Sequence, residues 1–282
     1  MDKNKLIPGS VDYKKALAAI IIAGAAAFCM EYCLQPVISK IAATFTLKPA
    51  QASIAVSAAM LGMALTLFVL TSFADRLPRR KMLAGSLIVS SAVLMGVSFI
   101  QSFAAIVALR FAQGCILALV PVLAMAYVNV EFTAGKTAFG IGMYVCGTTL
   151  GGLTGRISTS VLTDFVGWQH AITIISGITA VIGILVLFML PPDHHIVPKN
   201  AKTFSLAVFN KKNKKLFYLC LAAFCMMGSF MASYNFISYV LKDAPYNLSQ
   251  SVIGFLYGVQ IFGTLSSAVS GKLNAKFGSG KI

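Results

Sequence analysis

The chain has 282 residues, of which 58% are hydrophobic and only 11% are charged. A soluble domain carries about a quarter charged residues, so this composition excludes an ordinary soluble protein. The net charge of +15 does not indicate nucleic-acid binding, because the basic residues lie in short runs between apolar segments and form no single patch.

Eight apolar segments are long enough to cross a bilayer, whose hydrocarbon core of roughly 30 Å needs about 20 helical residues. The first is longer than a signal-peptide core, so we expect a retained span. Charge or turn-forming residues separate the segments. The spans are predicted at 16–38, 51–74, 82–101, 103–129, 137–162, 168–190, 216–241 and 251–271.

A charged elbow separates the second and third spans. Five charges lie within Asp75–Lys81, and four of them are basic. Such a cluster cannot lie in hydrocarbon, and basic loops mark the cytoplasmic side of a membrane. A weaker copy, Gly271–Lys281, closes the sequence, with Lys281 placed 200 residues after Lys81. Repetition of a helix–helix elbow at this distance points to a duplicated transporter.

The distribution of Lys and Arg predicts the orientation of the spans. One side receives 18 of the 23 basic residues and the other side receives four, which are Lys40, Lys48, Arg156 and Lys242; Arg110 remains inside a span. Because the basic side is cytoplasmic, we expect a cytoplasmic N-terminus.

A polar connector is predicted to divide the chain into a first unit over 1–190, a basic cytoplasmic linker over 191–215, and a second unit over 216–282. The linker contains the adjacent residues His194 and His195. Neighbouring histidines in a solvated loop without a third ligand do not predict a metal site. The six cysteines lie in apolar segments, where we expect free thiols.

Three motifs follow one another along the chain: one in the elbow between the second and third spans, one in the fourth span and one in the fifth span. The elbow is similar to the pattern G-x-L-A-D-R-x-G-R-R/K. Thr71 and Pro78 stand at its two glycine positions, and the matching residues are Ala74, Asp75, Arg76, Arg79, Arg80 and Lys81. Arg110–Gly114 matches R-x-x-Q-G in full, and Gly147–Gly152 is similar to G-P-x-x-G-G with threonine in place of proline. Together they resemble the major facilitator superfamily, and in detail its bacterial sugar or drug efflux permeases.

The resemblance implies an all-α, polytopic transmembrane helical bundle in the bacterial inner membrane. The family has twelve spans in two halves, so we expect a six-helix N-terminal half plus two helices of the C-terminal half, truncated after the eighth helix. Where the first elbow has Asp75, the second has Ala275.

The implied function is secondary active transport of a small organic solute, as proton-coupled efflux by alternating access. We expect no enzyme activity and no cofactor, and the chain has no ATP-binding loop of the G-x-x-x-x-G-K-[ST] type. The expected partners are the lipid bilayer, a solute and protons. The alternatives are an inactive remnant, one piece of a transporter whose C-terminal half is separately encoded, or a membrane solute sensor.

Glu31 and Arg110 are candidates for proton coupling, because ionisable groups inside spans are costly and suggest function or a buried partner. Each lies about 10 Å below the outer end of its predicted span, so the two could form an ion pair. Protonation of Glu31 would then release Arg110. In the alternative interpretation, Glu31 only neutralises Arg110.

The resemblance implies that Asp75, with Arg76 and the basic residues after it, forms a cytoplasmic gate motif that caps a helix of the opposite half. We expect Arg79 or Arg80 to pair with Glu131. A loop that only sets topology is the alternative. The remaining candidates are Lys81 in the elbow, Gln113 and Gly114 in the fourth span, and Gly147, Gly151, Gly152 and Gly155, whose spacing favours close helix packing or a hinge.

Overall fold

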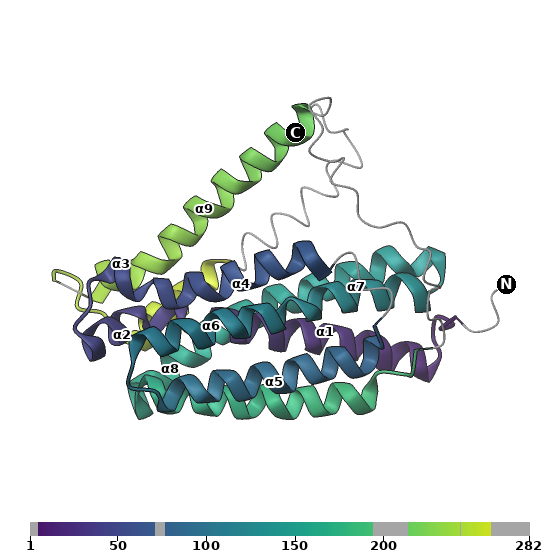
Figure 1. Ribbon diagram of the computed structural model, residues 1–282, viewed down its shortest axis with the longest axis horizontal. Helices are drawn as coiled ribbons and strands as arrows, with labels where there is room; N and C mark the ends of the chain where they lie inside the picture. Colours follow the sequence, from purple (N-terminus) through teal and green to yellow (C-terminus); the bar gives the residue numbers. More distant parts are fainter. Residues whose placement is uncertain (1–4, 71–76, 194–213, 243, 261–282) are drawn as a thin grey trace.

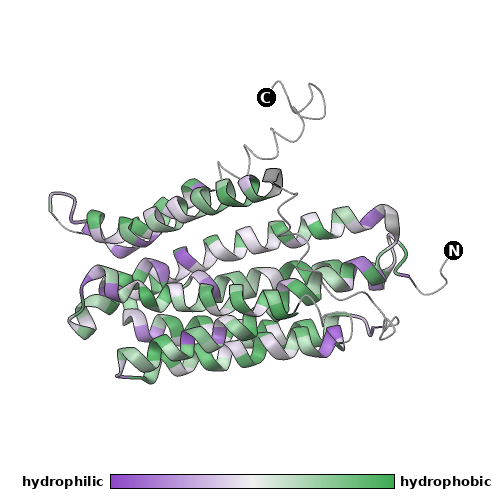
Figure 2. Cartoon of the chain, turned by 45° about the horizontal axis from the view of Figure 1, so that its top comes forward, coloured by the Kyte–Doolittle hydropathy of each residue, from purple (hydrophilic) through white to green (hydrophobic). Residues whose placement is uncertain are grey.

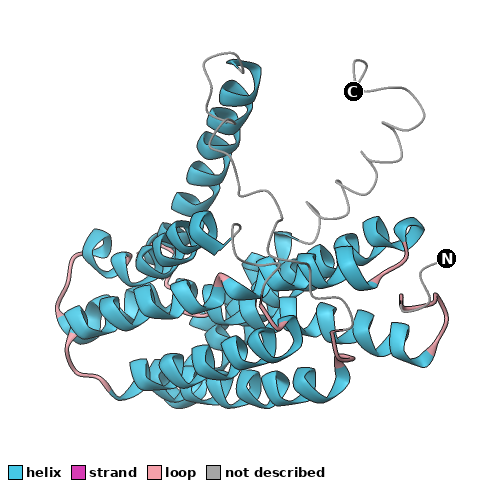
Figure 3. Cartoon of the chain, turned by 45° about the vertical axis from the view of Figure 1, so that its right-hand side comes forward, coloured by secondary structure: helices cyan, strands magenta, loops and turns pink. Residues whose placement is uncertain are grey.

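A computed structural model describes residues 5–70, 77–193, 214–242 and 244–260. The described part is helical and contains no strand (Figure 3), apart from one isolated bridge between Leu6 and Phe132. Its elements are α1 (Val11–Tyr32), η1 (Gln35–Val37), α2 (Ile38–Phe45), α3 (Pro49–Ala52), α4 (Ile54–Leu70), α5 (Arg79–Phe99), α6 (Phe103–Leu117), α7 (Leu119–Glu131), α8 (Ala134–Met189), α9 (Lys214–Lys242), α10 (Gln250–Leu256) and η4 (Tyr257–Val259).

Two prolines explain why single membrane crossings are divided into two elements. A proline ring clashes with the carbonyl group four residues earlier. Pro36 stands four residues after Tyr32, where α1 ends, and Pro121 stands four residues after Leu117, where α6 ends. In both places the chain continues as a helix in nearly the same direction (Figure 1), so each bend lies within one crossing.

The helices α1 to α8 form one bundle of roughly parallel and antiparallel helices, which we call the six-helix unit (Figure 1). Within it, α1 and α5 pack along α8, and α4 packs along α6. The α8 segment contains two crossings, because Gly167 adopts a φ of 80° and reverses the chain there. A positive φ is readily adopted by glycine and costly for other residues.

The predicted spans agree closely with these helices. Five runs of 21 residues or more are apolar enough to cross a membrane within 11–189, one of them the double crossing Gly135–Met189, and a sixth is Phe217–Lys242. The first run, Val11–Phe45, is longer at both ends than the predicted 16–38. The eighth predicted span begins within the helix Gln250–Val259, and its part after residue 260 lies outside the described residues, as do the second elbow and most of the linker.

The surface of the bundle is apolar (Figure 2). Large hydrophobic side chains such as Phe68, Phe99 and Phe188 are more than 60% exposed, whereas Arg110, Gln113 and Arg156 are completely buried. Apolar residues outside and polar residues inside are the arrangement expected when lipid surrounds a helical bundle.

The helix α9 contacts the six-helix unit at one end only (Figure 1). We call the end of the bundle that carries α2 and α3 the α2 end, and the end that carries residues 77–81 the elbow end. Residues 217–229 of α9 are exposed, whereas Asn235 and Ser238 nearer its C-terminus are buried. The interface with α9 and α10 is therefore closed at the α2 end, and α9 diverges toward the elbow end.

Candidate functional site

Arg110 is buried in α6 and joins three helices of the six-helix unit. Its Nη1 and Nη2 atoms donate to the carbonyl groups of Met30 (3.1 Å) and Glu31 (2.8 Å) in α1. Its Nε donates to the carbonyl of Ala55 in α4 at 3.3 Å, and Nη1 also donates to the side chain of Gln113 at 2.5 Å. Because backbone carbonyls supply most of its acceptors, Arg110 is held in a fixed place.

The neighbouring motif residues support this arrangement. Gln113 is buried, and it both accepts from Arg110 and donates to the carbonyl of Ser90 in α5 at 3.4 Å. A side chain at Gly114 would collide with the backbone of Ala59. The R-x-x-Q-G motif therefore sets the distance between α4 and α6 and places the arginine between α1 and α4.

Glu31 lies next to Arg110, as predicted, but the contact differs from the one expected. The guanidinium donates to the carbonyl oxygen of Glu31, and both carboxyl oxygens are buried without a hydrogen-bond partner among the residues that the structure describes. Since the first helical run continues to Phe45, Glu31 also lies deeper than the predicted boundary implied.

The elbow is described from Leu77 onward, so Asp75 and Arg76 lie outside the described residues. The backbone amide of Arg80 donates to Asp193 at 3.3 Å, and its Nε donates to the carbonyl of Leu187 at 2.9 Å. Lys81 is exposed. Arg79 and Glu131 are both buried at the elbow end, and their pairing stays a prediction.

The glycine-rich face of α8 lies directly against the backbone of α1. Side chains at Gly147 and Gly151 would collide with the carbonyls of Ile21 and Ala25, and a Cβ at Gly155 would come within 2.6 Å of the Cys29 carbonyl. The contacts repeat every four residues on both helices, so the two backbones approach along one continuous seam. Gly152 instead faces the ring of Tyr32.

The family model described as Major Facilitator Superfamily matches residues 20–282. The chain belongs to this superfamily. It is 30% identical over 277 residues to an uncharacterized MFS-type transporter, YybF, of Bacillus subtilis, covering 97% of this chain and 69% of that protein. It is 28% identical to the inner membrane transport protein YnfM of Escherichia coli, covering 97% of this chain and 66% of that protein.

A solved structure has the same fold. It is a bacterial homologue of the human lysosomal transporter Spinster, in an inward-facing and unoccupied conformation, with a TM-score of 0.77 and 18% identity; the match covers 96% of this chain and 64% of that one. The prediction of an all-α polytopic bundle of the major facilitator type is confirmed. The chain spans about two thirds of the length of these relatives. Membership places it among multi-pass membrane transporters and not among enzymes.

Sequence reasoning missed a second buried arginine. Arg156 was counted with the basic residues outside the membrane, but the structure places it inside α8, completely buried. Gly167, where the crossing ends, lies eleven residues later, which corresponds to a depth of about 16 Å. The signal was available, since residue 156 falls within the predicted span 137–162.

Arg156 lies where the six-helix unit meets α9 and α10. Its Nε donates to Gln35 at 2.7 Å, and its Nη1 donates to the carbonyl of Gly152 at 3.0 Å and to Gln260 at 3.3 Å. Three aromatic rings surround the guanidinium, at 4.1, 5.2 and 5.8 Å from its carbon to the ring centroids; they belong to Tyr32, Tyr234 and Tyr257. We call these residues together the Arg156 cluster.

Polar contacts close the same interface toward the α2 end. Gln35 donates to Asn235 of α9 at 2.6 Å, and Gln250 of α10 donates to the carbonyl of Pro36. At the rim, the carboxylate of Asp164 accepts from the backbone amide of Ser251 at 2.7 Å and from its hydroxyl at 2.6 Å. The interface is therefore held mainly by side chains, unlike the seam between α1 and α8.

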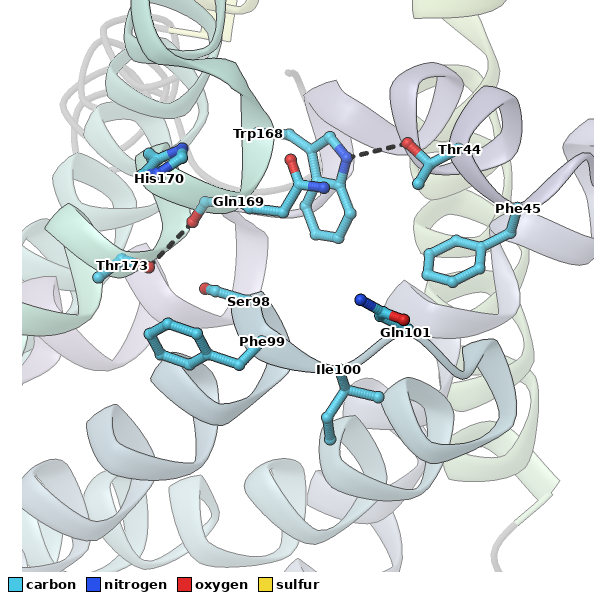
Figure 4. Close-up of a pocket in the computed structure, with 10 residues that line it drawn as sticks. All are labelled: Thr44, Phe45, Ser98, Phe99, Ile100, Gln101, Trp168, Gln169, His170 and Thr173. Atoms are coloured by element: carbon cyan, nitrogen blue, oxygen red, sulfur yellow. Dashed lines mark hydrogen bonds between the residues drawn. The ribbon is translucent and has the colours of Figure 1, made fainter.

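The described part of the chain also contains a pocket of about 690 Å³ at the α2 end of the six-helix unit (Figure 4). Trp168 donates to Thr44 at 3.1 Å along its wall. Other wall residues include Ser98, Gln101 and His170. No residue of α9 or α10 lines it, so it lies away from the interface between the two units.

Proposed function

We propose that the chain carries out secondary active transport of a small organic solute, as proton-coupled export by alternating access across the bacterial inner membrane with the N-terminus in the cytoplasm. The observation that carries the proposal is the asymmetric interface between the six-helix unit and α9–α10. Contacts join the units at the α2 end, and residues 217–229 of α9 are exposed toward the elbow end.

This asymmetry supports alternating access for a physical reason. The contacts at the α2 end include side-chain hydrogen bonds, such as the one between Gln35 and Asn235, and a neutral bond of this kind contributes only about 0.5–1.5 kcal/mol. A rocking motion of one unit against the other can break these bonds, which opens the interface at the α2 end and closes it at the elbow end. In the proposed orientation the α2 end is external, because the basic elbow marks the cytoplasmic face.

Glu31 supports the coupling to protons. It is 2% exposed, and within the described residues its carboxyl oxygens have no hydrogen-bond partner. An ionisable group buried in this way inside a span suggests function. The guanidinium of Arg110 is bound to the backbone carbonyl of Glu31. Its positive charge is therefore near the Glu31 side chain when that carboxyl group releases its proton. Export as the direction rests on the resemblance of the motifs to those of efflux permeases.

The test is solute-driven proton movement in liposomes that contain the purified 282-residue chain and a trapped pH-sensitive dye. A panel of sugars, amines, carboxylates and hydrophobic drugs is added on one side. We expect at least one compound to move protons, and Glu31→Gln to abolish that signal while solute binding remains.

Asp12→Asn is the matched control, because Asp12 is an exposed carboxylate in the first turn of the same helix. Full pH-driven transport by Glu31→Gln would contradict the proposed coupling. Solute binding without any flux in the unmodified chain would contradict transport itself and favour a sensor.

A further inference from the structure

Arg156 is a buried cation, and no acidic side chain contacts it in the part of the chain that the structure describes. Among the described residues, its polar contacts are two amide oxygens, of Gln35 and Gln260, and the carbonyl of Gly152. Its Nη2 atom is buried and finds no hydrogen-bond partner within the described ranges. A cation inside a membrane protein is costly unless something offsets its charge, and three ring faces offset only part of that cost.

The contacts of Arg156 come from both units. Tyr32, Gln35 and Gly152 belong to the six-helix unit, whereas Tyr234 and Tyr257 belong to α9 and to η4, which follows α10. A rearrangement that separates the two units would therefore open the cluster. It would also uncover the Nη2 atom, which lacks an acceptor among the described residues.

We propose that Arg156 binds the carboxylate group of the solute, and that the surrounding tyrosine rings contact an apolar, ring-bearing body. This inference rests on the proposed function, because it identifies the chemical class of the solute transported. A carboxylate would supply the missing acceptor at Nη2 and the missing negative charge, and Arg is suited to carboxylates by its planar fork of donors.

The geometry also explains why one carboxylate would be sufficient. The bond from Nη1 to Gln260 is long, at 3.3 Å, so a second carboxylate oxygen can replace it at little cost. The bonds from Nε to Gln35 and from Nη1 to Gly152 are shorter and would keep the guanidinium in place. Tyr32 is the nearest ring, with its centroid 4.1 Å from the guanidinium carbon.

The experiment compares benzoate with benzamide, which has a similar shape and no charge. Equilibrium binding to the detergent-purified 282-residue chain is measured at constant pH, with acetate as a carboxylate that lacks a ring. We expect benzoate to bind at least tenfold more tightly than benzamide and than acetate. Arg156→Gln should weaken benzoate binding at least tenfold, and Arg156→Lys should weaken it less, because the charge remains without the fork.

Lys48→Gln is the control, since it removes one positive charge from an exposed position at the α2 end. Equal binding of benzoate and benzamide, or unchanged benzoate binding by Arg156→Gln, would overturn the proposal, as would no binding of either compound. The first comparison needs only the unmodified chain, so it decides even if a variant does not fold. This binding experiment does not depend on transport. If benzoate binds here but moves no protons in the liposome assay, that result counts against the proposed transport and not against this site.

Discussion

Two completely buried arginines within the membrane bundle are held in opposite ways. Arg110 donates to three backbone carbonyls of α1 and α4 and to one side chain of its own helix, all within the six-helix unit. Arg156 is surrounded by side chains of both units, and one of its nitrogens has no hydrogen-bond partner in the described part of the chain. A cation bound by carbonyls of packed helices fixes structure, whereas one bound by exchangeable side chains at an interface is available to a ligand.

The largest expected effect tests this contrast directly. Arg110→Ala removes four buried hydrogen bonds that join α1, α4 and α6, so we expect a loss of about 3–5 kcal/mol in the free energy of unfolding. Arg156→Ala should cost less than half as much, because its amide and ring partners can rearrange. Thermal unfolding of both variants in detergent measures the difference. Equal losses would show that the two arginines have the same structural role.

The sequence indicated that both arginines lie within predicted spans, but it did not reveal their contacts. Arg110 was recognised from its motif, and its acceptors are backbone carbonyls, which residue identity does not reveal. Arg156 belongs to no motif, and its contact Gln35 pairs with Asn235, 200 residues away in the sequence. Long-range pairs of this kind depend on how two units meet, which the sequence of each helix does not specify.

The helices themselves were predictable, because hydrophobic length, proline position and charge act locally. The prolines at 36 and 121 lie within predicted spans, and the predicted bounds 137–162 and 168–190 leave the turn at 163–167, where Gly167 has its positive φ. The spacing of the α8 glycines indicated a close helix contact, but only the structure shows that its partner is α1.

An intermediate effect is expected from tightening that contact. Gly151→Ala would push a methyl group into the carbonyl of Ala25, and overpacking of this kind costs about 1–3 kcal/mol. Gly142→Ala on the same helix is the matched control, because nothing lies within 4 Å of the added atom. Thermal unfolding should separate the two variants, and a Gly151→Ala protein as stable as its control would mean that the seam between α1 and α8 is loose.

The smallest expected effect concerns the rim of the interface between the units. Asp164→Ala removes two hydrogen bonds to Ser251 at an exposed position, so the unfolding temperature should change little. The equilibrium between closed and open interfaces should shift more visibly, because about 1 kcal/mol changes a population ratio roughly fivefold. In a cysteine-free background, Ser238→Cys reports opening, since Ser238 is completely buried in α9.

We expect a membrane-impermeant maleimide to label that cysteine about threefold to tenfold faster from outside the cell when Asp164 is replaced by alanine. Asp12→Ala removes an equal charge at the elbow end and should leave the labelling rate unchanged. If the Asp164 variant were labelled no faster than this control, the rim bonds would not hold the interface closed. The closed interface would then depend on the contacts nearer to Arg156, which are those of Gln35, Asn235 and the tyrosine rings. The side chains that surround Arg156 would in that case themselves hold the two units together.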